Sequence, residues 1–324
     1  MEKFKFITHD IRDAYFNLAS EEYLLKHTDG FYFYLWINNP AVIVGVNQNT
    51  IEEVNLKHTE AHHVKVVRRL TGGGAVYHDG GNLCYTVIAP YTEGENYYKK
   101  FTAPVIEYLN ELGVKAEFSG RNDVVINGKK ISGNAQTVYN GKIMHHGTLL
   151  FNANLDGLKN ALIPNKLKMQ SKGIKSIRAR VTNVKDYLNC DMNIMEFKKG
   201  LENKLLQFCE PYEFSESDKS KISALVVDKY STYEWNVGYS PKSENSFTEK
   251  FEFGIIKINF DTKDGCMQNV KISGDFFSKK DVSGLEQKLN GVRFEKNAVL
   301  ESLENIQEYI QGAEAKGIID AIFS

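Results

Sequence analysis

Two arginines and three consecutive glycines form the first group of residues that could bind a charged ligand. Arg68 and Arg69 come first, Thr71 follows, and the glycines occupy 72–74. Glycine lets backbone N–H groups converge on an anion without side chains in the way, and arginine offers phosphate oxygens a bidentate fork. The run lacks the lysine and hydroxyl residue that end a P-loop, and it does not have dinucleotide-binding spacing. It therefore predicts either a phosphate-binding loop or a plain glycine turn between strands.

A second group of polar residues lies between positions 120 and 136. Asp123 could give an oxygen ligand to Mg²⁺, or it could be a turn residue before a strand. After it, polar side chains recur at every second position, which places them on one face of a strand: Lys130, Ser132, Asn134 and Gln136. That face is either solvated or lines a polar cleft.

The dipeptide Asn140-Gly141 is a strong signal for a two-residue hairpin turn. If this turn closes, Lys130 pairs with Phe151 and Ser132 with Leu149 across the two strands. A lysine framed by apolar neighbours suits an apolar substrate with an anionic head group. An exposed lysine above a half-buried sheet would have the same pattern.

The histidines do not form a metal-binding pattern. His145 and His146 are adjacent, as are His62 and His63, so at most one of each pair can enter a given site on a strand. No set of His, Cys, Asp and Glu has the spacing of metal ligands. We expect structural histidines, or histidines that support other site residues.

The four cysteines are widely separated, which excludes a disulfide framework and a cysteine zinc site. They are Cys84, Cys190, Cys209 and Cys266. We expect isolated, buried thiols in a reducing compartment.

A strongly basic window follows Asp156 and ends before Asp186. Its 29 residues contain eight lysines and arginines and no acid, although the whole chain has a net charge of −1: Lys159, Lys166, Lys168, Lys172, Lys175, Arg178, Arg180 and Lys185. Such a window predicts a surface that attracts an acidic protein or a polyphosphate, unless acids from elsewhere compensate it in space. No nucleic-acid-binding motif accompanies it.

Apolar periodicity predicts the elements that must position these residues. Strands are expected at Phe4–Thr8, Phe31–Ile37, Ala41–Val46, Val64–Arg68, Asn82–Ala89, Val124–Asn127, Lys130–Tyr139, Lys142–Asn152, Phe251–Phe260 and Met267–Ile272. Helices are expected from Asp13 to about Lys26, and at Glu95–Leu112, Ile194–Phe208 and Asp218–Lys229, with more helices at the C-terminal end. Pro104 lies inside the second of these, so we expect a kink or a late start there.

Length and composition describe an ordinary globular protein. At roughly 150 residues per domain, 324 residues give about two domains. The polar segment 240–246 is the predicted linker, so we expect an α+β protein with domains 1–245 and 246–324. An aromatic content of 12% excludes disorder. No signal sequence or membrane-spanning run is visible, and we expect a cytoplasmic location.

Taken together, the motifs resemble those of the lipoate–protein ligase A family, within the biotin and lipoate ligase superfamily. The resemblance covers nearly the whole chain, with Thr71 standing where a serine is common. The matching segments are Arg68 to Asp79, Gly81 to Thr86, Gly120 to Asp123, Lys130 to Ala135, His145 to Leu150, and Lys172 to Asn183.

This resemblance implies a biotin-ligase-like catalytic domain with mixed and antiparallel sheets and flanking helices, followed by a small α+β accessory domain. It also implies two reactions. ATP and lipoate, with Mg²⁺, give lipoyl-AMP and pyrophosphate. The lipoyl group then passes to a lysine of a lipoyl domain, in the E2 subunits of 2-oxo acid dehydrogenases or in the glycine-cleavage H protein. We expect a monomer that needs neither nucleic acid nor membrane.

The resemblance also implies roles for individual residues. Lys130 would be the catalytic residue and would contact the lipoyl carboxyl and the α-phosphate, and Asp123 would be the Mg²⁺ ligand. The nucleotide would be bound by Arg69, Gly74, Ala75, Val76, Tyr77, Asn122, Asp123 and Lys130. The lipoyl pocket would be formed by Thr71, Gly73, His78, Lys130, Gly133, His146 and Gly147. The basic segment near Lys166–Arg180 is expected to close over the intermediate.

Three alternatives stay open at this point. An octanoyl- or lipoyl-transferase on the same scaffold would use a cysteine thioester and no ATP, but no cysteine lies between Cys84 and Cys190. Biotin ligation is disfavoured because the glycine-rich biotin motif is absent. A non-catalytic paralogue that binds lipoyl domains is the third, and the presence of Lys130, Arg69 and Asp123 argues against it.

Overall fold

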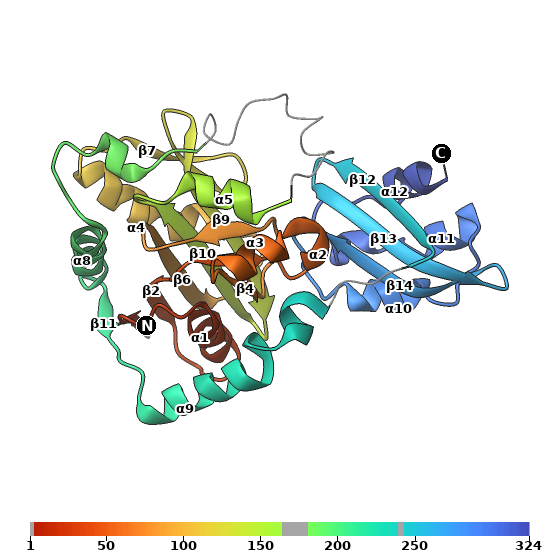
Figure 1. The fold of residues 1–324 in the computed structure, drawn as a ribbon, viewed down its shortest axis with the longest axis horizontal. Helices are drawn as coiled ribbons and strands as arrows, with labels where there is room; N and C mark the ends of the chain where they lie inside the picture. Colours follow the sequence, from red (N-terminus) through yellow and green to blue (C-terminus); the bar gives the residue numbers. More distant parts are fainter. Residues whose placement is uncertain (1–2, 164–180, 239–242, 324) are drawn as a thin grey trace.

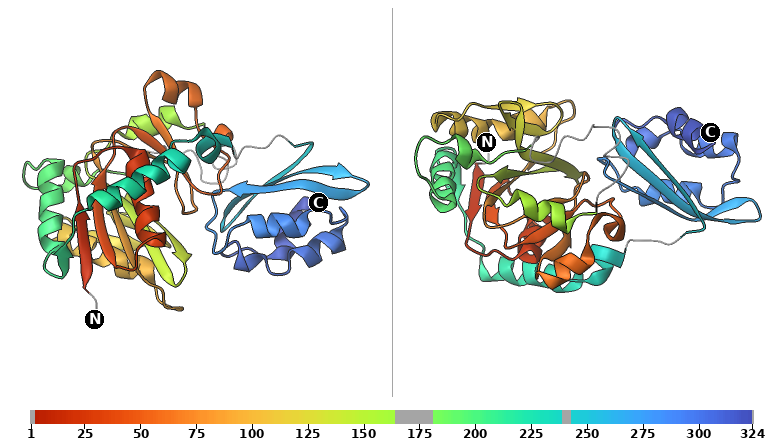
Figure 2. Two further views of the ribbon diagram at one scale, coloured as in Figure 1. Left: turned by 90° about the horizontal axis from the view of Figure 1, so that it is seen from below. Right: turned by 45° about the horizontal axis from the view of Figure 1, so that its top comes forward.

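The computed structural model describes residues 3–163, 181–238 and 243–323, which form two lobes joined side by side (Figure 1). The larger lobe contains β1 to β11 and the smaller one β12 to β14. In the smaller lobe the three strands lie on one side and the helices on the other (Figure 2). The α+β class is therefore confirmed. The predicted division between residues 245 and 246 stays a prediction, and β12 begins at Asn245.

A mixed eight-stranded sheet forms the centre of the larger lobe, in the order β11-β1-β2-β6-β10-β9-β8-β7. β1 is parallel to its neighbours β2 and β11, and the other pairs are antiparallel. The strands are β1 (Phe4–Thr8), β2 (Tyr32–Ile37), β6 (Asn82–Pro90), β7 (Ala116–Ser119), β8 (Asp123–Ile126), β9 (Lys129–Tyr139), β10 (Lys142–Leu150) and β11 (Cys209–Pro211). A second sheet contains β4 (Lys65–Arg68), β3 (Ala41–Val44) and β5 (Val76–His78), in that order.

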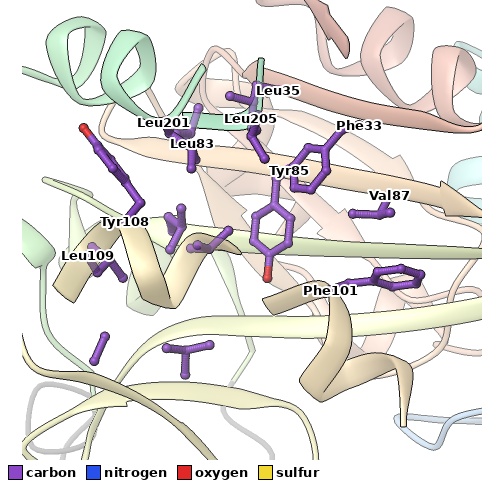
Figure 3. Close-up of a cluster of buried hydrophobic side chains, with 14 of the residues drawn as sticks. Phe33, Leu35, Leu83, Tyr85, Val87, Phe101, Tyr108, Leu109, Leu201 and Leu205 are labelled. Atoms are coloured by element: carbon purple, nitrogen blue, oxygen red, sulfur yellow. The ribbon is translucent and has the colours of Figure 1, made fainter. Parts of the chain in front are cut away.

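Helices cover both faces of the large sheet, so its central strands are buried on both sides. In β2, Phe33 and Leu35 face the helices α4 and α8, whereas Tyr34 and Trp36 face α1 and α9. Figure 3 shows the first of these clusters, where the rings of Phe33 and Tyr85 lie side by side. Burying each such side chain contributes roughly 1.5–3 kcal/mol.

Four helices of the larger lobe, α1, α4, α8 and α9, lie where the periodicity predicted helices, whereas the short helices α2, α3 and α5 were not predicted. The helices of this lobe are α1 (Ala14–Lys26), α2 (Thr50–Glu53), α3 (Leu56–Ala61), α4 (Tyr97–Glu111), α5 (Leu155–Ala161), α8 (Ile194–Leu205) and α9 (Glu216–Leu225), with a 3₁₀ turn η1 (Val184–Tyr187) and two π-helical turns, η2 (Val226–Tyr230) and η3 (Glu234–Gly238). Asp13 caps α1 as predicted, because its side chain accepts the N–H groups of Tyr15 and Phe16. The helix α4 runs through Pro104 without interruption.

The predicted hairpin between β9 and β10 is confirmed. Asn140 and Gly141 both have positive φ, 45° and 72°, as a two-residue hairpin turn of type I′ requires. The predicted pairings of Lys130 with Phe151 and of Ser132 with Leu149 are wrong, because the β9–β10 ladder ends at the pair Asn134–Gly147. Before that point β9 leaves β10: Lys130 pairs with Val125 of β8 and forms a bridge to Val181 on its other side.

The smaller lobe contains an antiparallel three-stranded sheet with helices on one face. Its elements are β12 (Asn245–Phe251), β13 (Gly254–Lys263), β14 (Cys266–Gly274), α10 (Ser283–Leu289), α11 (Lys296–Ser302), the 3₁₀ turn η4 (Ile306–Glu308) and α12 (Ala315–Ile322). The single strand predicted at Phe251–Phe260 is wrong, since a tight turn at Glu252-Phe253 divides it between β12 and β13. Phe251, Phe253 and Ile255 continue a period-two apolar pattern through the turn, so the sequence shows no break between the two strands.

Backbone hydrogen bonds connect the two lobes directly. The N–H of Gly274 donates to the carbonyl of Asn47 at 2.7 Å, and the N–H of Gly73 donates to the carbonyl of Phe276 at 3.1 Å. An ion pair between Lys257 and Glu52 also crosses the boundary. The smaller lobe therefore contacts the glycine loop. None of the helices in the described part of the chain has the length and apolar character needed to cross a membrane.

Candidate active site

A cavity of about 220 Å³ lies where the large sheet, α1 and the glycine loop meet. It brings together most of the residues that the sequence motifs singled out: Arg69, Gly73, Gly74, Ala75, Val76, His78, Asn122, Lys130, Gly133, His146 and Gly147. These residues come from four separate segments of the chain. The motifs therefore belong to one site.

Three of the predicted site residues do not line this cavity. Thr71 lies behind the wall, where its hydroxyl contacts His146. Asp123 stands beside Lys130 and holds its ammonium group. Tyr77 lies between Val76 and His78 on β5, so its side chain points to the opposite face of the strand. Its ring packs close to Gly157 and joins the cluster around Val42.

Lys130 extends from β9 and keeps contact with solvent. Its Nζ lies 2.7 Å from Oδ1 of Asp123, and both side chains are more than a third exposed. Gly133 leaves room for this position, because a Cβ there would lie 2.7 Å from the Lys130 Nζ and would displace the end of the lysine side chain. The ammonium group is thus held at the polar edge of the cavity by one carboxylate, within reach of a ligand anion.

A pair of asparagines fixes the turn that carries Asp123. The side-chain amide of Asn122 donates to the carbonyl of Asn134 at 2.7 Å, and that of Asn134 donates to the carbonyl of Asn122 at 3.0 Å. The hydroxyl of Tyr85 donates to Oδ1 of Asn134 from within the sheet. These bonds set the distance between the turn and β9, and so the position of Asp123 beside Lys130.

Arg69 lines the cavity but uses its guanidinium mainly to hold the glycine loop. It donates to the carbonyls of Ile43, Gly72 and Gly74 at 2.6–3.1 Å, and its Nε donates to Thr71. Burial lowers the pKa of Arg69 to about 10, which leaves it charged at neutral pH. Because two loop carbonyls are turned toward this cation, the loop keeps its negative dipole ends away from an anionic ligand.

A buried hydrogen-bonded chain supports His146 on the sheet face below α1. The Nδ1 of His146 lies 2.9 Å from a carboxylate oxygen of Glu21, and its Nε2 lies 2.7 Å from the hydroxyl of Thr71. Glu21 also accepts from Thr86, whose hydroxyl accepts from the Trp36 indole. This chain fixes the His146 ring and joins α1, β2, β6 and β10 to the glycine loop.

The inner end of the cavity contains a neutral histidine and a thiol. Burial, assisted by the charge of Arg69, lowers the pKa of His78 to about 3. Asn38 contacts His78 Nδ1 at 3.1 Å, and its own oxygen accepts from Asn17, so the amide group of Asn38 donates to the ring. Burial also raises the pKa of the Cys84 thiol well above its usual value.

Cys84 lines the cavity although the sequence motifs gave it no role. Cys84 and Cys209 are buried as expected, but Cys190 is exposed and Cys266 half-buried, so the prediction of four buried thiols is wrong. All four are free. Cys190 lies in the connection between η1 and α8. The spacing between cysteines does not reveal that it is exposed there.

Several lining residues lie outside the residues predicted for the site: Leu18, Trp36, Ile43, Cys84, Asn134, Ala135, Thr148 and Phe277. The period-two pattern of β9 contained Asn134, and continuing the Lys130–Ala135 motif would have included it. Cys84 and Thr148 belong to other segments of the motif set. Leu18, Trp36 and Phe277 have no local signal, because they reach the site only through the packing of distant elements.

The cavity has an apolar inner end and a polar outer end. Leu18, Trp36 and Ile43 form the apolar part, while Lys130 and Asn122 stand at the polar part beside the glycine loop. Such a cavity suits a ligand with an apolar body and an anionic head group. In the described part of the chain no group of three or more His, Cys, Asp or Glu residues could hold a metal ion.

Comparison with known proteins identifies the family. The model of the lipoyl protein ligase A/B catalytic domain matches residues 13–206, and that of the bacterial lipoate protein ligase C-terminus matches residues 240–322. The chain belongs to the lipoate–protein ligase family. It is 41% identical to the lipoate-protein ligase LplJ of Bacillus subtilis over 97% of this chain and 98% of the relative. It is 44% identical to lipoate–protein ligase 1 of Staphylococcus aureus, over 94% and 95%.

Solved structures of lipoate–protein ligases have the same fold. LipL1 of P. falciparum in complex with lipoate has a TM-score of 0.79 at 25% identity, covering 98% of this chain and 97% of its own. A lipoate-protein ligase A bound with ATP has a TM-score of 0.63 at 27% identity, covering 74% and 99%. A bipartite lipoate protein ligase of Thermoplasma acidophilum, described with its E2 lipoyl domain, has a TM-score of 0.66 at 29% identity, covering 75% and 99%. The chain is accordingly an enzyme of the ligase class.

The basic window can be placed only at its ends. Lys159 is exposed near the end of α5, and Lys185 belongs to η1, with its Nζ 3.4 Å from a carboxylate oxygen of Asp191. The other six basic residues fall in 164–180, outside the described residues. The predicted closure of this segment over the intermediate, and its attraction for an acidic partner, therefore stay predictions.

Proposed function

We propose that this ligase activates lipoate with ATP to lipoyl-AMP at the described cavity and then transfers the lipoyl group to a lysine of a protein acceptor. The observation that carries this proposal is the position of Lys130. Its ammonium group stands at the polar end of an apolar cavity, beside a glycine loop whose carbonyls are turned toward Arg69. One cation is thus within reach of both a carboxylate head group and a phosphate.

The chemistry of adenylation explains why a cation is needed there. An oxygen of the lipoate carboxylate attacks the α-phosphorus of ATP, and the bond to pyrophosphate breaks. Both reactants are anions, so their repulsion must be offset and the charge of the transition state stabilised. Lys130 can donate to both groups, while buried Arg69 holds the loop that shapes the nucleotide side. Neutral His78 keeps the inner end of the cavity free of charge.

Asp123 fits Mg²⁺ as a single protein ligand. Magnesium in nucleotide sites is usually bound through one or two carboxylates, substrate phosphates and water. Asp123 lies beside Lys130 at the polar end of the cavity, and it is more than a third exposed. A bound Mg²⁺ would neutralise phosphate charge there.

For the second step we propose lipoyl domains of 2-oxo acid dehydrogenase E2 subunits and the glycine-cleavage H protein as acceptors. The similar bipartite ligase described with its E2 lipoyl domain supports this class. The basic segment 166–180 is proposed to attract these acceptors and to close over lipoyl-AMP. ATP dependence and free thiols support a cytoplasmic location.

Lipoate-dependent exchange between ATP and pyrophosphate tests the first step. The wild type should exchange only with lipoate or a similar acid present, and Lys130→Ala should lose the exchange. Offering unmodified E2 lipoyl domain and H protein separately then identifies the acceptor. Absence of exchange with any acyl acid, in protein shown to be folded, would contradict the proposal.

A second function is kept because of one observation. Cys84 lies in the cavity wall, with its Sγ 3.5 Å from Nδ1 of His78. An ATP-independent acyltransferase would form a thioester on such a cysteine. The raised pKa of the thiol and the low pKa of His78 leave both groups neutral, which disfavours thiolate attack. Lipoyl transfer between lipoyl domains without ATP would support this alternative.

A further inference from the structure

One side chain of the smaller lobe enters the catalytic cavity. Phe277 follows β14, only 7% of it is exposed, and it lines the cavity together with residues of the larger lobe. Its neighbour Phe276 is fully buried in the core of the smaller lobe. The pair therefore spans the boundary, with Phe276 anchored in its own lobe and Phe277 reaching into the other.

Hydrogen bonds on both sides hold the Phe277 backbone in place. The carbonyl of Phe276 accepts the N–H of Gly73 at 3.1 Å, and the carbonyl of Phe277 accepts that of Gln311 at 3.0 Å. The next residue, Ser278, accepts from the side chain of Asn47 at 3.0 Å. Gly72 is required here, because a Cβ at that position would lie 2.4 Å from the Phe276 carbonyl.

The ring of Phe277 contacts the glycine loop on one side and Arg121 on the other. A Cβ on Gly73 would lie 3.2 Å from the ring edge, so the ring lies against the glycine loop. On the other side, the guanidinium carbon of Arg121 lies 4.6 Å from the ring centroid, a cation–π distance. Arg121 directly precedes Asn122, which lines the cavity, and Asp123, which holds Lys130.

We propose that Phe277 is a positioning residue for adenylation, which clamps the glycine loop to the turn that carries Asn122 and Asp123. The inference rests on the proposed function. Adenylation must hold two separate anions in one geometry, and this step depends strongly on precise placement. Transfer to the acceptor starts from lipoyl-AMP, in which the two parts are already covalently joined. Loss of the clamp therefore slows the first step much more than the second.

A second cavity also borders Phe277. It has a volume of about 800 Å³ and lies between the lobes, with Phe277, Arg121 and Gln136 among its lining residues. Phe277 thus borders both cavities. We therefore expect removal of its ring to open the adenylation site toward this larger space and to leave Lys130 and His146 in place.

The test measures the two half-reactions separately in full-length Phe277→Ala. We expect lipoate-dependent ATP–pyrophosphate exchange to fall about 10- to 100-fold, the loss that a displacement of about 1 Å can cause. Transfer from chemically prepared lipoyl-AMP to an unmodified E2 lipoyl domain should stay close to the wild-type rate. Phe277→Tyr keeps the ring and should restore the exchange.

Controls separate this role from a general loss of stability. Phe251→Ala removes a half-buried ring of the same lobe, which stacks on Phe253 and lines neither cavity, and should leave both half-reactions unchanged. Arg121→Ala changes an exposed residue, so it tests the clamp even where Phe277→Ala does not fold; it should slow exchange selectively.

Each further outcome has a distinct meaning. Equal losses in both half-reactions, or unchanged exchange in every folded clamp variant, would overturn the role of Phe277. Absence of exchange in the wild type would instead contradict the proposed function itself.

Discussion

Two cations reach the same cavity and are held in different ways. Lys130 is more than a third exposed and is held by the carboxylate of Asp123. Arg69 is buried and donates to three backbone carbonyls and one hydroxyl. A cation with four protein partners determines the shape of a loop, whereas a cation at an open edge can change partners when a ligand binds. Positive charge in a motif therefore does not by itself identify a ligand-binding residue.

Lys130→Ala should give the largest effect, and only on activity. Removing a group that stabilises transition-state charge typically lowers the rate by about 10²–10³-fold. The exposed ion pair with Asp123 contributes at most about 1 kcal/mol to stability. We expect lipoate-dependent exchange to be lost while the urea unfolding midpoint hardly changes. A large drop in that midpoint would show that Lys130 has a structural role and would remove the contrast with Arg69.

Arg69→Ala should show the opposite pattern, with stability affected first. The substitution leaves the carbonyls of Ile43, Gly72 and Gly74 without this donor, and each unsatisfied buried group costs about 1–3 kcal/mol. We expect the free energy of unfolding to fall by roughly 3 kcal/mol in urea titrations. Arg69→Lys is the matched variant and should not restore it, because an ammonium cannot reproduce the planar fork. Full recovery with lysine would show that charge alone matters.

The stability of the protein should also depend on pH, through His145 on the sheet face opposite the cavity. His145 points away from the cavity into an aromatic cluster, and burial lowers its pKa to about 3. Between pH 6.5 and 3 the unfolded chain binds a proton at this residue that the folded chain does not, so stability is complete near pH 7 and falls with decreasing pH. The loss from pH 7 to pH 5 is about 2 kcal/mol for this one histidine.

His145→Leu tests this expectation by urea titrations at the two pH values. The difference between pH 7 and pH 5 should be about 2 kcal/mol smaller in the variant than in the wild type. Packing changes affect both pH values equally and cancel in this difference. An identical pH dependence in the two proteins would show that His145 is not held neutral in the folded state.

The sequence predicted the parts of the fold that depend on local chemistry. The Asn140-Gly141 turn, the Asp13 cap and the period-two pattern of β9 follow from backbone preferences within a few residues. The pairing of Lys130 with Phe151 was wrong because β9 changes partners after Asn134, and that change depends on packing outside the hairpin.

The sequence predicted those site residues that belong to the recognised motifs, and it missed residues that packing brings in from elsewhere. Motif residues such as Gly73 and His146 line the cavity. The motifs assigned Arg69 to the nucleotide, but its hold on the glycine loop depends on backbone carbonyls that no motif reveals. Glu21 is fully buried in α1, although an acid in a helix is normally expected to face solvent. Phe277 comes from the other lobe, and no local pattern connects it to the glycine loop.

Cys84→Ala should give the smallest effect. It extends the comparison of Lys130 and Arg69 to an uncharged group at the apolar end of the cavity. The thiol lies in the cavity wall, but its raised pKa keeps it protonated, and adenylation needs no nucleophilic cysteine. We expect exchange within about threefold of the wild type, a change of less than about 0.7 kcal/mol in the barrier. Cys209→Ala, a buried thiol outside the cavity lining, is the matched control. If Cys84→Ala alone abolished lipoyl transfer, and if a lipoyl thioester could be trapped on the wild type, the reaction would pass through the cysteine. The cavity would then be that of an acyltransferase, and Lys130 would have to act on a thioester rather than on a phosphate.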